Sequence, residues 1–129
     1  MSKPVSLCVD DEKIVLDSLR TQLAAAFGDA YIYEGAEEGE EALDVINDIN
    51  DEGISFILII SDWLMPGIRG DELLIQIHQN YPHVLKIMLT GQANELAIDR
   101  AKKQANVHWC LSKPWWEADL LETIKIWFI

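Results

Sequence analysis

Short and almost uniformly apolar runs alternate along the chain with longer segments in which apolar residues recur every three or four positions. Five of the runs have the character of strands, at residues 5–9, 31–34, 56–61, 84–89 and 107–111, and the second is the weakest. Unbroken apolar character is typical of a strand buried on both faces, as in a parallel sheet. The alternation therefore predicts an α/β domain.

Each predicted strand precedes a segment in which apolar side chains would line one face of a helix. The stripes consist of Leu16, Leu19, Leu23 and Phe27; Ala42, Ile46 and Ile49; Leu73, Leu74 and Ile77; Ala97, Ile98, Ala101 and Ala105; and Leu120, Leu121, Ile124 and Phe128. Because a right-handed (βα)5 chain has few workable topologies, we expect a doubly wound, flavodoxin-like parallel sheet of order 2-1-3-4-5 with helices on both faces.

Composition narrows the class of protein further. Half of the 129 residues are hydrophobic, enough for one domain over residues 1–129, and 22 Asp and Glu against 10 Lys and Arg give a net charge of -12. A surface this acidic repels nucleic-acid phosphates and anionic lipids, so we expect neither as a direct partner. Nine of the acids lie between Glu34 and Glu52, where no Lys or Arg occurs, which indicates a solvated face.

The cysteines and the N-terminal segment predict a cytoplasmic protein. Cys8 and Cys110 both lie in apolar runs, where a thiol acts as a small core residue. Acidic residues from Asp10 onward interrupt any signal-peptide core, and the apolar runs are too short to span a bilayer.

The residues that end the predicted strands are polar or charged, and they carry the candidate chemistry. They are Asp10, Asp11, Asp62, Thr90 and Lys113. Strands one and three are neighbours in the expected order, so three carboxylates would crowd together at one edge of the sheet. A hard cation bound by oxygen ligands relieves their repulsion, and Mg²⁺ suits such a site.

A carboxylate beside Mg²⁺ can attack phosphorus, and Asp62 is the best candidate for this nucleophile. Thr90 offers a hydroxyl and Lys113 a positive charge to the phosphoryl oxygens. A cis bond at Pro114 would fix the direction of Lys113. Taken alone, Asp10 and Asp11 would favour a helix N-cap, and only their placement together with Asp62, Thr90 and Lys113 favours a site.

Four motifs in order resemble the receiver domain of two-component response regulators, of the chemotaxis-regulator type, over essentially the full length of the chain. They are Val9-Asp10-Asp11-Glu12, Asp62-Trp63-Leu64-Met65-Pro66-Gly67 with Gly70, Thr90-Gly91 and Ser112-Lys113-Pro114-Trp115.

The resemblance implies a phosphoacceptor signalling domain, which is not an enzyme beyond its own phosphorylation and dephosphorylation. Asp62 would accept a phosphoryl group from a histidine kinase or phosphotransfer protein, and Thr90 and Lys113 would hold it. Mg²⁺ would be bound by Asp11, Asp62 and the Leu64 backbone carbonyl, with Asp10 acting through water.

The expected partner downstream is an output domain or a separate protein. Four of the five tryptophans lie in the last 21 residues, at Trp109, Trp115, Trp116 and Trp127, and favour a Trp-rich C-terminal contact face. A homodimer is a further assembly that the sequence permits.

The chain departs from the family at two places. Cys110 stands where relatives carry an aromatic residue that swings inward on activation, and alternation places Trp109 on the opposite face of its strand, where we interpret it as packing. Leu64 and Gln92 occupy variable positions beside the phosphoryl group, and because leucine cannot position an attacking water, we expect slow self-dephosphorylation.

Two other classes of function fit these residues less well. A pseudo-receiver that binds proteins without phosphorylation is suggested only by Cys110, against the intact acidic residues and Lys113. A flavin carrier needs a hydroxyl-rich loop where Asp10 and Asp11 stand, and a Mg²⁺-dependent aspartyl phosphatase needs a second acid where Leu64 stands.

Overall fold

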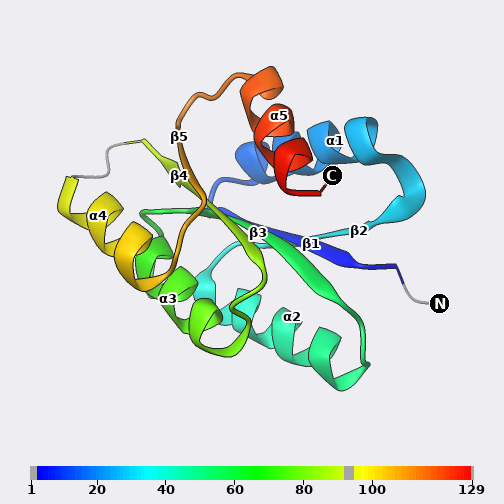
Figure 1. Cartoon of the computed structure of the whole chain (residues 1–129), viewed down its shortest axis with the longest axis horizontal. Coiled ribbons are helices and arrows are strands. Elements are labelled where there is room, and N and C mark those ends of the chain that lie inside the picture. The colour runs from blue at the N-terminus through cyan, green and yellow to red at the C-terminus, as the bar shows by residue number, and fades with distance from the viewer. Residues whose placement is uncertain (1–2, 92–94, 129) are drawn as a thin grey trace.

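The computed structural model describes residues 3–91 and 95–128, and at residues 127 and 128 it describes the backbone only. Over these residues, five strands alternate with five helices and one short 3-10 turn, arranged as Figure 1 shows. The elements are β1 (Val5–Val9), α1 (Lys13–Phe27), η1 (Gly28–Ala30), β2 (Ile32–Ala36), α2 (Gly39–Asp51), β3 (Phe56–Asp62), α3 (Gly70–Asn80), β4 (Leu85–Thr90), α4 (Glu95–Gln104), β5 (Trp109–Ser112) and α5 (Glu117–Phe128).

All strand pairs are parallel and the strand order is β2-β1-β3-β4-β5, so the predicted topology is confirmed. Helices α1 and α5 cover one face of the sheet, and α2, α3 and α4 cover the other (Figure 1). This arrangement brings the carboxyl ends of β1, β3, β4 and β5 to the same end of the sheet. A doubly wound fold binds its ligands at that end.

Two apolar cores flank the sheet, and the predicted helical stripes point into them. Leu19 and Leu23 of α1 are buried with Leu120 of α5 on one side. Ile46 of α2 and Leu73 of α3 are buried on the other side. The central strands β1 and β4 are buried along their whole length, as their mainly apolar sequences predict, although Ser6 and Lys86 are buried with them.

The edge strands differ most from their predicted bounds. β2 begins one residue later than the predicted range 31–34 and ends two residues later. It ends later because Gly35 and Ala36 pair with Cys8 and Val9 of β1. β5 is a short strand at the other edge. An edge strand has one neighbour and is partly exposed, so its apolar pattern is weaker than that of a central strand.

Both cysteines are free thiols, and Cys8 is a core residue as expected. Burial raises the pKa of Cys8 to about 12, so this thiol stays protonated. Within the described part of the chain, no helix combines the length and the apolar character that crossing a membrane requires.

Candidate functional site

The polar residues at the strand ends meet in one pocket. Asp62 and Thr90 are the last residues of β3 and β4, and Asp10 directly follows β1. These three side chains are buried, whereas Asp11 is exposed to solvent. The pocket therefore has a buried floor and an open acidic side.

Lys113 connects the carboxylates. Its ammonium lies 2.7 Å from Asp10 Oδ2, 3.2 Å from Asp62 Oδ1 and 3.6 Å from Glu12 Oε1. The peptide bond between Lys113 and Pro114 is cis, as predicted. A buried ion pair of this kind holds charged groups in place at a high desolvation cost, which is typical of functional sites.

Asp10 and Asp11 do not cap α1. The residue before the helix is Glu12, and its side chain makes no capping hydrogen bond. Asp10 Oδ1 instead accepts a hydrogen bond from the Glu12 backbone N–H at 2.9 Å, which aims the other carboxylate oxygen at Lys113. The capping interpretation is therefore wrong, since Asp10 turns into the pocket.

The acidic residues fit a divalent cation. One oxygen from each of Asp10, Asp11 and Asp62 lies within 4.8 Å of the others, so a single ion can contact all three. Oxygen-only ligands with one solvent-facing side match the preference of Mg²⁺, which keeps several waters.

Burial and charge shift the acidity of the central groups. Burial, then repulsion by Asp10, raises the pKa of Asp62 to about 6, although Lys113 opposes this shift. Burial disfavours the Lys113 ammonium, but its hydrogen bond to Asp10 and its attraction to both carboxylates raise its pKa. Asp62 is thus mostly ionised at neutral pH, as a nucleophile must be.

The loop after β3 returns close to Asp62. The Gly70 N–H donates to the Trp63 carbonyl at 2.7 Å, and a Cβ atom at Gly70 would collide with the Asp62 backbone carbonyl. Met65 anchors the loop in the core, while the Leu64 side chain is 60% exposed. The motif around Asp62 therefore has a structural part, Met65 and Gly70, and a solvent-facing part, Leu64.

Thr90 lies beside this loop. Its hydroxyl donates to the Leu111 carbonyl at 3.4 Å, so in this structure it is engaged with β5. Gln92, which the sequence also singled out, falls outside the described residues.

The faces of β5 alternate as predicted. Half-buried Cys110 packs against the core beneath α3 and α4, whereas Leu111 belongs to the core beneath α1 and α5. Trp109 is 49% exposed, and with Ile126 of α5 it lines a hollow of about 570 Å³. The interpretation of Trp109 as a packing residue is therefore only half right, because much of its ring faces solvent.

The other described tryptophans divide by exposure. The Trp116 side chain is 79% exposed, while Trp115 is half-buried and donates its indole N–H to Gln22 of α1 at 2.9 Å. The side chain of Trp127 lies outside the described set. The exposed members are Trp109 and Trp116, on and just after β5.

Two ion-pair contacts of the structure are not predicted from the sequence, one in the pocket and one between α3 and α4. Glu12 approaches Lys113, and its place in the acidic motif was the available signal. Buried Asp71 accepts a hydrogen bond from the Arg100 guanidinium at 3.1 Å, and Glu72 accepts one from the same guanidinium at 2.6 Å. These contacts connect α3 to α4. No local sequence pattern indicates them.

Comparisons with known proteins agree with this geometry. The model of the response regulator receiver domain matches residues 6–125. The hydrogenase transcriptional regulatory protein HoxA of Cupriavidus necator is 28% identical over 119 residues, which cover 92% of this chain and 23% of that protein. The chain thus spans less than a quarter of that relative's length.

Solved structures are similar over nearly the whole chain. The signal receiver domain of an HD domain-containing protein from Pseudomonas fluorescens is 28% identical with a TM-score of 0.85, covering 98% of this chain and 95% of that one. A CheY-like response regulator receiver domain protein from Methanospirillum hungatei is 32% identical with a TM-score of 0.81, covering 98% and 93%. With the family model spanning most of its length, the chain belongs to the receiver domains of two-component response regulators.

Proposed function

We propose that this domain accepts a phosphoryl group on Asp62 from a histidine kinase or phosphotransfer protein. The contact of Lys113 with both Asp10 and Asp62, inside a pocket of three carboxylates, is the observation that carries this proposal. An ammonium held at this point can neutralise one oxygen of a phosphoryl group attached to Asp62.

The transfer is a nucleophilic displacement at phosphorus. An Asp62 carboxylate oxygen forms a bond to phosphorus while the bond from phosphorus to the donor's histidine nitrogen breaks, and that nitrogen keeps the electron pair. Bound Mg²⁺, held by Asp11, Asp62 and the Leu64 carbonyl with Asp10 in support, would neutralise charge on the transferring oxygens. The chain itself orients Asp62 and supplies Lys113 and Thr90 to the product.

Phosphorylation would then reposition Thr90. Its hydroxyl bonds the Leu111 carbonyl at 3.4 Å, a long hydrogen bond that a charged phosphoryl oxygen can outcompete. Since Cys110 replaces the aromatic residue of the family's switch, we propose that the signal leaves through displacement of the α4 and β5 backbone.

We further propose that residues 1–129 act as one receiver domain in the cytoplasm. Its output would be a further domain or a separate protein that contacts the Trp-rich C-terminal face, with no direct role for nucleic acid or membrane.

Acetyl phosphate labelling tests the acceptor. Wild-type protein with Mg²⁺ should gain the mass of one phosphoryl group, and Asp62→Asn or added EDTA should abolish the gain. Beryllium fluoride should also change tryptophan emission, because Trp63 adjoins Asp62. Absence of both responses would mean that the domain signals without phosphorylation.

A further inference from the structure

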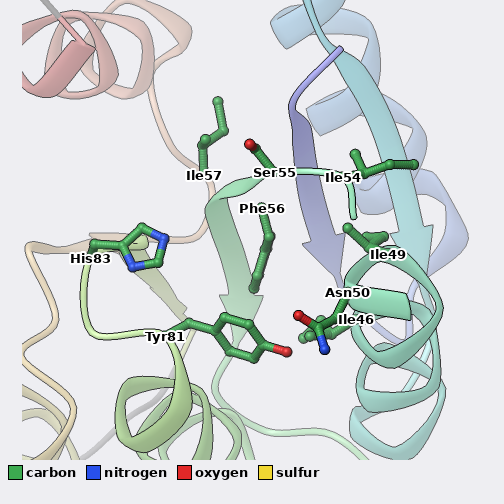
Figure 2. A pocket seen from close by; sticks show the side chains of 9 residues that line it. All are labelled: Ile46, Ile49, Asn50, Ile54, Ser55, Phe56, Ile57, Tyr81 and His83. Atoms are coloured by element: carbon green, nitrogen blue, oxygen red, sulfur yellow. The ribbon is translucent and has the colours of Figure 1, made fainter. Parts of the chain in front are cut away.

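A groove with an apolar floor lies between α2 and α3. It lies toward the end of the sheet where the strands begin, whereas the acidic pocket lies at the end where they terminate. Two adjoining hollows of about 280 and 420 Å³ share Ile46, Asn50 and Tyr81. The first hollow reaches the start of β3 at Phe56, and Figure 2 shows it from close by.

Tyr81 is the central residue of this groove. Figure 2 shows its ring directed from the end of α3 toward Ile46 and Asn50 of α2. The ring meets Phe56 edge-on, with centroids 5.8 Å apart, and it is only partly buried. Ile46 and Phe56 are buried beneath it, so an apolar side chain placed over Tyr81 would complete an existing cluster.

The α2 rim of the groove is acidic. Glu40, Asp44 and Asp51 are exposed and recur at four- and seven-residue spacing, which places them in one row beside the groove. Among the described side chains, no Lys or Arg forms an ion pair with any of these three carboxylates. The α3 rim carries the neutral residues Gln76 and Asn80.

We propose that this groove docks a basic amphipathic helix of a partner protein. Apolar side chains of that helix would lie over Tyr81, and its Lys or Arg residues would face Glu40, Asp44 and Asp51. The acidic row spans three helical turns, about 16 Å, which a helix of roughly ten to twelve residues matches. An acidic ligand, or a second copy of this chain with its charge of -12, would meet repulsion at the same rim.

A labelled synthetic helix of Leu, Lys and Ala, with Leu on one face and Lys beside it, is a suitable probe. Fluorescence anisotropy should show that this peptide binds the wild-type chain. On adding the peptide, the backbone amide NMR shifts of the domain should change at residues of α2 and at the end of α3. A peptide with Ser in place of Leu should bind much more weakly. Equal binding by the Ser peptide, or shifts centred elsewhere, would overturn the proposal.

Variants that remove charge distinguish binding in the groove from attraction by the net charge of the chain. The triple variant E40Q/D44N/D51N should weaken probe binding roughly tenfold, as expected for three exposed ion pairs. The matched control E34Q/E117Q/E122Q removes the same charge elsewhere and should change binding less than twofold. Asn80→Lys, a cation placed in the groove, should also weaken binding. Equal losses in the triple variant and its control would show that only net charge attracts the probe.

Discussion

Lys113 opposes the rise in the pKa of Asp62, and this gives a prediction for one side chain. The ammonium lies 3.2 Å from Asp62 and lowers its pKa against the effects of burial and Asp10. Lys113→Met should therefore raise the Asp62 pKa above about 6. A carbon-13 NMR titration of the carboxyl group measures this, with exposed Lys125→Met as the control. An Asp62 pKa that does not move would show that the ammonium has no influence on it.

We predict that Leu64 affects a second property, the lifetime of the proposed phosphorylated state. Its exposed side chain has no group that can orient a water toward phosphorus. Leu64→Asn should shorten the lifetime several-fold, whereas Ile14→Asn, at another exposed apolar position, should leave it unchanged. Loss of labelled phosphate after removal of the donor measures both, and equal lifetimes for Leu64→Asn and wild type would contradict the prediction.

At the scale of elements, the junction between β3 and α3 depends on a glycine. A Cβ atom at Gly70 meets the Asp62 carbonyl, whereas one at Gly91 meets nothing within 4 Å. Gly70→Ala should lower the free energy of unfolding by about 1–3 kcal/mol, because two pieces of backbone must separate. Gly91→Ala is the matched control and should cost much less in urea unfolding. Equal costs would show that the close approach at Gly70 is easily relieved.

The elements also show what the sequence predicts well. Central strands and helix stripes such as Leu16 to Leu23 follow from apolar periodicity, since burial imposes that pattern directly. The end of β2 does not, because Gly35 and Ala36 have the composition of a turn and pair only through the neighbouring β1. Of the site, residue types and strand-end positions are predictable, but the Lys113 contacts and the Asp71–Arg100 ion pair depend on tertiary packing.

At the scale of the whole molecule, stability depends on a buried charge. Lys86 of β4 is fully buried, and its ammonium donates to the Val84 carbonyl at 2.9 Å and the Pro82 carbonyl at 3.5 Å. Burial lowers its pKa to about 8. Between about pH 8 and 10.4 the unfolded chain therefore binds more protons than the folded one. The free-energy cost of burying the charged Lys86 ammonium disappears as pH rises through that window.

Lys86→Met should consequently stabilise the domain at pH 7 by roughly 2–3 kcal/mol, less what the two lost hydrogen bonds contributed. The gain should shrink between pH 8 and 10.4, because wild-type Lys86 then becomes neutral in the folded state. Urea unfolding at pH 7 and 10 measures the difference, with exposed Lys125→Met as the control. A gain that does not change with pH would contradict this account.

Asp62 makes stability depend on pH in the opposite direction to Lys86, and it does so at lower pH. Its raised pKa means that its contribution to stability is greatest below the unfolded pKa near 3.9 and is lost as pH rises through about 6. Asp62 is thus least favourable to the stability of the fold at neutral pH, where its carboxyl group is mostly ionised.

The strand order also has a consequence for biosynthesis. β1 leaves the ribosome before the other four strands of the sheet, yet it lies between β2 and β3 in the finished sheet. It gains its second neighbour only when the ribosome has released the chain through Asp62, and until then a strand that is fully buried in the finished sheet has an open edge. Nascent chains shorter than this should need a chaperone, and translation pauses before β3 should be harmful.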